Sequence, residues 1–252
     1  MPGKSGIYLG VSELSDSESS TSSKCSVRSL SPQPHYTPKR ENPTRKVVDS
    51  LLDKFLFEKL KCTRNSEIKR ILESAIYDHL DNTEHIYRWL FDNENTLQYK
   101  SLLGFFLLMG IGCESNLNKA FQKFIAAAKK DYLIGHEMVG DCYLNGWGTP
   151  KNDELAFQWY KKCVDNNEGS FYGYFALGYC YESGKGVVKD EVEAFRCYDR
   201  CAKLGNVMAM RTLADRYTNG VGVARNSEKA NFWYQKALEK EMMESTAFLD
   251  NV

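Results

Sequence analysis

The chain has 252 residues, and its 33 basic side chains balance its 33 acidic ones. A net charge of zero gives no electrostatic reason to expect binding to nucleic acid or to an anionic membrane surface. The first residues lack the apolar core of a secretion signal, and the most apolar run, residues 102–113, is too short to cross a bilayer. We therefore expect a cytoplasmic protein without membrane insertion.

Residues 1–46 are predicted to form a disordered tail. Up to position 31 serine is frequent and hydrophobic residues are sparse, and Pro32, Pro34, Pro38 and Pro43 follow. Such a segment cannot bury enough apolar surface to offset the entropy lost on ordering. Ser31 and Thr37 each precede a proline, so they are candidate phosphorylation sites, although serine-rich tails match such patterns by composition alone.

Residues 47–97 are predicted to form N-terminal capping helices. After a first helix with one apolar face, a second would be capped by Asn65 or Ser66, and a third would open at Thr83. The last two resemble one degenerate repeat without turn glycines, as terminal units of repeat arrays often do. The apolar face of the first helix consists of Val48, Leu51, Leu52, Phe55, Leu56 and Leu60.

Residues 98–240 carry four copies of a sequence repeat. Gly-x-Gly triplets begin, at intervals of 36, 38 and 36 residues, at Gly110, Gly146, Gly184 and Gly220. An alanine stands ten residues after the first glycine of each triplet, at Ala120, Ala156, Ala194 and Ala230. A fixed period of this length indicates one supersecondary unit stacked on copies of itself.

Each repeat is predicted to contain two helices, A and B. The glycines would end helix A in a turn whose backbone dihedral angles are unfavourable for residues with a side chain. Helix B would begin after a good N-cap residue, at Asn116, Asn152, Asp190 and Asn226. In the third copy Glu193 is placed to complete a reciprocal capping box with Asp190. Small residues would let helix B pack closely on helix A, at Gly104, Gly140, Gly178 and Ala214.

These copies resemble the Sel-1-like repeat, a relative of the tetratricopeptide repeat. The fourth copy carries Leu213-Ala214, Tyr217, Gly220-Val221-Gly222, Lys229-Ala230 and Trp233-Tyr234. The resemblance covers about residues 98–240 and implies an all-α, right-handed α-solenoid. The copies are most similar to arrays in fungal signalling and regulatory proteins. Residues 241–252 would then be a C-terminal cap or a truncated fifth repeat that begins a helix at Ser245.

No motif in the chain predicts catalysis, so we expect no enzyme activity, no cofactor and no metal. The four histidines share no motif spacing, and Gly184-Lys185-Gly186 lacks the frame of a phosphate-binding loop. Cys197 and Cys201 are spaced like two metal ligands, but no nearby pair completes four.

The cysteines are predicted to remain reduced. Cysteine-rich bacterial relatives pair a cysteine near the end of helix B with one in the next helix A. Cys163 and Cys201 match the first position, but Tyr174 and Met210 occupy the second. The missing pairs favour a reducing compartment.

Function is therefore expected to lie in a binding surface. By analogy with tetratricopeptide repeats, helix A side chains would line a concave face that binds a peptide or a domain of a partner protein. We predict a non-catalytic interaction scaffold or adaptor in intracellular signalling or regulation, acting as a monomer. The alternatives are a regulatory or structural subunit, such as an activator of a cell-wall synthase or a component of a degradation complex, and, more remotely, a hydrolytic enzyme. The predicted binding residues are Phe105, Glu137, Asp141, Phe175, Tyr179, Glu182, Arg211 and Asp215.

Overall fold

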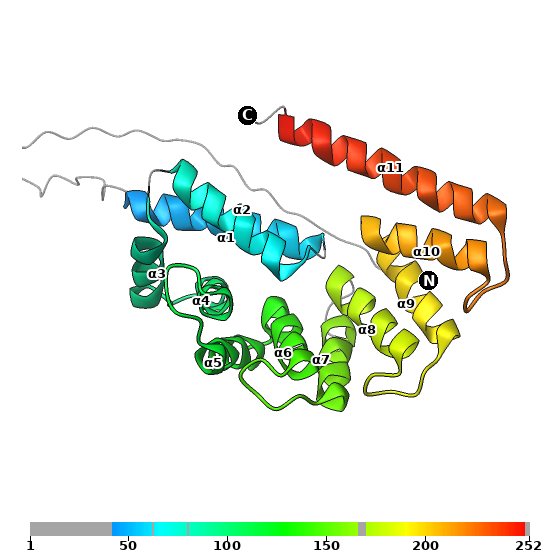
Figure 1. Ribbon diagram of the computed structural model, residues 1–252, viewed down its shortest axis with the longest axis horizontal. Coiled ribbons are helices and arrows are strands. Elements are labelled where there is room, and N and C mark those ends of the chain that lie inside the picture. Colours follow the sequence, from blue (N-terminus) through cyan, green and yellow to red (C-terminus); the bar gives the residue numbers. More distant parts are fainter. Residues whose placement is uncertain (1–41, 62, 80, 166–169, 250–252) are drawn as a thin grey trace, which may run out of the picture. The chain divides into compact units, whose positions relative to one another are not determined.

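The computed structural model describes residues 42–61, 63–79, 81–165 and 170–249, which fold into helices (Figure 1). These residues form eleven helices and no strand, so the predicted all-α solenoid class is confirmed. The predictions made for the tail, including Ser31 and Thr37, lie outside the described residues. Among the helices that are described, none is both long and apolar enough to cross a membrane.

Three helices precede the glycine-marked repeats: α1 (Pro43–Leu60), α2 (Asn65–Asp78) and α3 (Thr83–Asp92). α1 begins four residues before the predicted start at Val47. The side chain of Asn42 accepts a hydrogen bond from the Thr44 amide (3.0 Å), and a proline suits the first helical position. α3 opens at Thr83 as predicted, whereas the predicted cap of α2 by Asn65 or Ser66 is wrong, because Arg64 precedes this helix without a side-chain cap.

The four repeats follow as alternating A and B helices. Their bounds are α4 (Leu97–Met109) and α5 (Leu117–Ala128), α6 (Leu133–Asn145) and α7 (Asp153–Asp165), α8 (Phe171–Ser183) and α9 (Glu191–Lys203), and α10 (Val207–Asn219) and α11 (Ser227–Leu249). The helix that was expected to begin separately at Ser245 is absent, because α11 continues without a break through this position.

The two glycines of each triplet have different structural roles, as the second repeat shows: the first ends helix A, and the second contacts the preceding helix B. Gly146 ends α6 in the left-handed region (φ +76°), and its amide donates to the Cys142 carbonyl at 2.8 Å. Gly148 also has a positive φ, and a Cβ atom added to it would lie 2.1 Å from the Leu117 carbonyl oxygen at the start of α5. The second glycine therefore lets each repeat contact the helix B before it.

The other three triplets make the same inter-repeat contact. The partner of the second glycine is in each case the first residue of the preceding B helix, and the pairs are Gly112 with Thr83, Gly186 with Asp153 and Gly222 with Glu191. Thr83 belongs to α3, so α3 meets the first full repeat in the way that a helix B would. α3 thus occupies the place of a helix B, but α2 packs mainly on α1 and is not paired with α3 in the way that helix A is paired with helix B in the other repeats.

The predicted N-caps of the B helices are confirmed. Asp190 accepts hydrogen bonds from the Val192 and Glu193 amides. The side-chain oxygens of Asn116, Asn152 and Asn226 likewise each accept a hydrogen bond from a backbone amide in the first turn of their helix. The reciprocal half of the predicted capping box is wrong. The Asp190 amide donates to the Tyr181 carbonyl (2.9 Å), and Glu193 pairs with Arg196 instead.

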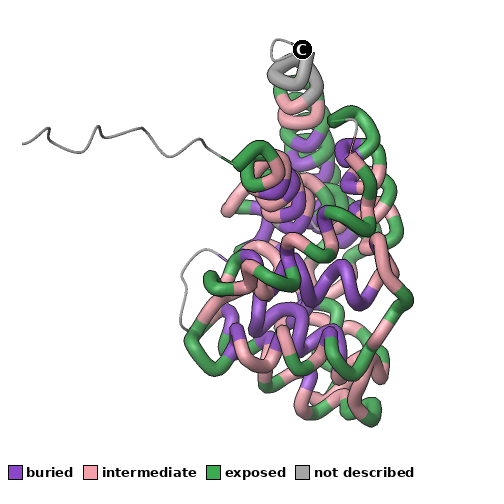
Figure 2. Tube along the Cα trace, turned by 90° about the vertical axis from the view of Figure 1, so that its left-hand side faces the viewer, coloured by how far each residue is buried: buried purple, intermediate pink, exposed green. Residues whose placement is uncertain are grey.

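Buried residues follow the inside of the stack, and exposed ones lie on its turns and outer faces (Figure 2). Within repeats, the small helix A residues face an aromatic ring of helix B, since a Cβ on Gly140 would lie 2.4 Å from Tyr160. Between repeats, edge-to-face aromatic pairs join helix B to the next helix A, at Phe121 with Tyr143, Phe157 with Tyr181 and Phe195 with Tyr217. In α11 the corresponding position is an exposed asparagine, Asn231.

Candidate functional site

α1 lies against the A helices rather than beside them as another repeat. The Phe55 ring is fully buried and contacts the Phe105 ring of α4, with centroids 5.0 Å apart. Val48 and Leu51, which precede Phe55 on the same helix face, are also fully buried. The apolar stripe of α1 therefore covers part of the face that was predicted to be open to a partner.

One turn beyond Phe55, the side chain of Lys59 is buried, including its ammonium group. Its ammonium group lies 3.8 Å from a carboxylate oxygen of Asp141 in α6 and 4.4 Å from the ring centre of Tyr172 in α8. The hydroxyls of Tyr160 and Tyr172 donate to the other oxygen of Asp141, at 2.8 and 2.5 Å. Burying a charge is costly unless it is paired, and here both charges have partners.

Glu137 lies one turn before Asp141 on α6 and joins this buried cluster. Ser170 donates a hydrogen bond to one of its carboxylate oxygens (3.4 Å), and the other oxygen has no hydrogen-bond partner. Burial raises the pKa of Glu137 to about 7, with Lys59 opposing the rise and Asp141 adding to it. Two carboxylates therefore face a single lysine.

Three predicted binding residues are covered in this structure. Phe105, Glu137 and Asp141 have exposed fractions of 0, 3 and 4%. The projection from the sequence assumed that this face of the A helices was open. α1 lies across it, so these residues contact the chain's own helix.

The other five predicted residues lie on α8 and α10, beyond α1. Phe175 is half-buried against Tyr198, with ring centroids 5.4 Å apart. Tyr179 is 39% exposed, and its hydroxyl accepts a hydrogen bond from Lys185 (2.8 Å). Both Arg211 and Asp215 are exposed.

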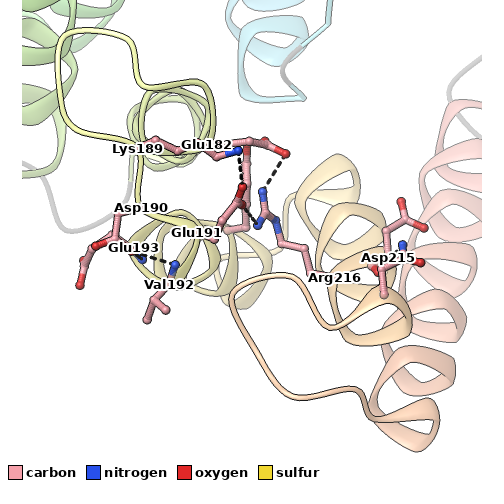
Figure 3. A network of polar contacts seen from close by, with 10 residues as sticks. Glu182, Lys189, Asp190, Glu191, Val192, Glu193, Asp215 and Arg216 are labelled. Carbon is pink, nitrogen blue, oxygen red and sulfur yellow. Dashed lines mark hydrogen bonds and ion pairs between the residues drawn. The ribbon is translucent and has the colours of Figure 1, made fainter.

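Glu182 links α8 to α9 and α10 at the junction of the third and fourth repeats. It accepts a hydrogen bond from the Tyr198 hydroxyl (2.8 Å) and forms an ion pair with Arg216 (2.9 Å). Arg216 is buried and also pairs with Glu191 at 3.1 Å (Figure 3). Its guanidinium lies 4.8 Å from the Tyr198 ring centre. Sequence reasoning identified Glu182 but missed its partner.

Arg211 and Asp215 also have partners within the last repeat. Arg211 donates two hydrogen bonds to Glu241 of α11, at 3.1 and 2.7 Å, and Asp215 accepts a hydrogen bond from Tyr234. The Arg211 pair is bidentate, which is the stronger geometry for an exposed ion pair, so a partner protein that binds Arg211 must replace these two hydrogen bonds with comparable ones.

A groove of about 1810 Å³ runs between α1 and α2 on one side and α10 and α11 on the other. Met210 lies at its base, the exposed apolar side chains of Phe57 and Met243 line it, and Lys61 and Glu244 form an ion pair across it (3.4 Å). Charges of both signs alternate along its walls, among them Lys54, Glu58, Arg70, Asp78, Lys236 and Glu239.

Sequence reasoning missed the groove because its two walls are more than 130 residues apart in the chain. The sequence contains one weak indication that Lys59 is buried. Lys59 follows Phe55 by four residues, so it lies within the apolar stripe that was recognised on α1. No comparable signal identified Tyr172 as its neighbour.

Nowhere among the described residues do three or more His, Cys, Asp or Glu side chains gather so that they could hold a metal ion. Cys163 is a free thiol, and Cys201 donates its S–H to the Phe171 carbonyl. Burial raises the pKa of Cys142 and of Cys180 to about 12, so both are poor nucleophiles in the folded chain.

Comparison with known proteins agrees with this architecture. No curated protein matches the chain. Among solved structures, the chain is similar to a Sel1 repeat protein from Oxalobacter formigenes, with 25% identity, a TM-score of 0.59 and coverage of 70% of this chain and 73% of that one. It is also similar to a protective antigen of uropathogenic Escherichia coli that displays an SLR fold, with 28% identity and a TM-score of 0.56. That match covers 61% of this chain but only 33% of the antigen.

The model of the Sel1 repeat matches four times, over residues 101–132, 134–167, 172–206 and 207–241. Each match spans most of one A helix and one B helix, from α4 and α5 to α10 and α11. The matches together cover more than half of the chain, which therefore belongs to the Sel1 repeat family.

Proposed function

We propose that the chain is a non-catalytic scaffold that binds a partner protein on the part of the helix A face that α1 leaves uncovered. Sel1 repeat proteins are generally protein-interaction scaffolds. The observation that carries the proposal is a difference between equivalent positions. Tyr179, Arg211 and Asp215 on α8 and α10 are exposed, whereas the corresponding residues on α4 and α6 are buried beneath α1.

This uncovered face suits a segment with an apolar anchor and charged neighbours. Tyr179 offers a large, rigid ring with a polar end, which is typical of residues that contribute strongly to interfaces. Arg211 and Asp215 lie one turn apart on α10 and present both signs of charge. The groove beside Met210 continues this surface toward α1 and α2.

We propose that the scaffold acts in a reducing compartment inside the cell. Cys163 is a free thiol, and the buried, poorly ionised Cys142 and Cys180 suit a reducing intracellular compartment. We place the scaffold in intracellular signalling or regulation.

The proposal is tested by quantitative proximity labelling in the native cell with a double variant of the binding face, Tyr179→Ala with Arg211→Glu. The matched control is Tyr77→Ala with Arg196→Glu, which changes a tyrosine that is 78% exposed on α2 and an exposed arginine on α9. We expect the control to retain the wild-type partners and the double variant to lose a defined subset.

Equal labelling by both variants would refute binding at α8 and α10. Any deletion of the tail in this assay should end at Glu41, because Asn42 caps α1 and a deletion through residue 46 removes the first turn of this helix.

A further inference from the structure

α1 contacts the solenoid as a bound helix does. Its buried residues Val48, Leu51, Phe55 and Lys59 follow the spacing i, i+3, i+7 and i+11, which places them on one face. Phe55 contacts α4, and Lys59 contacts α6 and α8. One helix face thus meets three successive A helices, which is the pattern by which amphipathic helices are recognised in grooves.

α1 also differs from the helices of the repeats. The second glycine of each triplet joins one repeat to the B helix before it, and the first such contact is made by α3 rather than by α1. α1 therefore lies outside the chain of glycine contacts that defines the stack. α1 packs on α2 and α3 as well, and its contacts with the A helices include those of Phe55 and Lys59 and a hydrogen bond that Asp49 accepts from the Tyr99 hydroxyl of α4.

Near Lys59, the A-helix surface beneath α1 carries polar groups that α1 pairs only in part. Glu137 and Asp141 are both more than nine-tenths buried, and they share the single positive charge of Lys59. One carboxylate oxygen of Glu137 has no hydrogen-bond partner. A buried acceptor without a donor is costly, so a helix that brings a further donor to this point would match the groove better than α1 does.

The geometry points to a helix-binding groove on α4, α6 and α8 in which α1 is the built-in occupant. We infer that a partner takes the place of α1 with an amphipathic helix of the same pattern, apolar at i, i+3 and i+7 and basic at i+11. This inference rests on the proposed scaffold function and adds a second site to it, distinct from the uncovered face of α8 and α10.

The test uses the full chain with α1 loosened and the groove unchanged. Phe55→Asp removes the main apolar contact of α1 but alters no residue of α4, α6 or α8. The probe is a fluorescent peptide with the sequence of residues 42–61, and binding is followed by fluorescence anisotropy. Because the occupied groove reduces the apparent affinity by the fraction of open molecules, we expect the peptide to bind the variant at least tenfold more tightly than the wild type.

Two controls make the readout specific. The chain variant Phe57→Asp alters the half-exposed side of α1 and should bind the peptide as weakly as the wild type does. A peptide carrying Lys59→Glu should bind the Phe55→Asp chain at least tenfold less tightly than the unmodified peptide. A peptide carrying Arg45→Glu, which makes the same change of charge at an exposed position, should lose little.

If Phe55→Asp loses its helical circular dichroism, a second experiment replaces it. A protease site inserted after Lys61 allows α1 to be cut from an otherwise native chain, and the labelled peptide should then exchange with the cut segment. A folded Phe55→Asp chain that binds no tighter than the wild type, or a cut chain that exchanges no peptide at large excess, would overturn the inference. Partner loss with the Tyr179 and Arg211 variants would remain, so the two failures are distinguishable.

Discussion

The two glycines of one triplet provide a matched pair of substitutions, Gly146→Ala and Gly148→Ala. Both glycines have positive φ angles, +76° and +70°, which side chains disfavour. They differ in what a new methyl group would meet. At Gly146 the nearest atoms lie 3.7 Å away, whereas at Gly148 the Leu117 carbonyl oxygen is 2.1 Å away.

The expected costs follow from this difference. The left-handed backbone alone costs about 1–2 kcal/mol for a residue with a Cβ, and Gly146→Ala should show only this effect. In Gly148→Ala the backbones of α5 and the turn must also separate, and overpacking of this kind adds about 1–3 kcal/mol. We therefore expect Gly148→Ala to lower the free energy of unfolding by about 3 kcal/mol or more.

Urea unfolding followed by circular dichroism measures both variants. Because repeats are coupled mainly to their neighbours, weakening one junction should also broaden or split the unfolding transition of Gly148→Ala. Equal destabilisation by the two substitutions would refute the assignment of the second glycine to the inter-repeat contact.

Three further predictions concern the core. Since the pKa of Glu137 is raised from 4.5 to about 7, the folded chain binds a proton that the unfolded chain has lost, so stability should fall by about 3 kcal/mol as the pH rises through this window. Urea titrations of Glu137→Gln from pH 4.5 to 7.5 should lack this fall, and an unchanged slope would contradict the assignment. Phe157→Ala removes the edge-to-face contact with Tyr181 and should cost about 2 kcal/mol in the same assay. Cys142 and Cys180 should react with a thiol reagent at pH 8 only after unfolding, as peptide mapping would show, and rapid labelling of the native chain would argue against their burial.

The repeats could be predicted from the sequence because their signals are local. A glycine at a helix end and an asparagine before the next helix each act over a few residues, so Gly146 and Asn152 identify their turn without knowledge of the rest of the chain. Their recurrence at a fixed interval then determines how the helices stack.

The position of α1 could not be predicted in this way. Its apolar stripe shows that one face is buried but not where, since the contact of Phe55 with Phe105 joins residues 50 positions apart. The pairing of Lys59 with Asp141 spans a greater separation still. The assumption that the predicted binding face is accessible was therefore wrong over α4 and α6, where the predicted residues are buried.

The equivalence of the inter-repeat junctions bears on how such an array changes length during evolution. Because each junction uses the same glycine contact and the same aromatic pair, a duplicated unit inserted downstream of α8 would find matching neighbours on both sides. A unit inserted between α4 and α8 would instead move Phe105, Asp141 and Tyr172 apart, and a single straight helix could no longer reach all three. The contacts of α1 with α4, α6 and α8 thus limit the number of repeats between these helices, whereas a unit added later in the array would disturb the partly exposed contact of Lys61 with Glu244 instead.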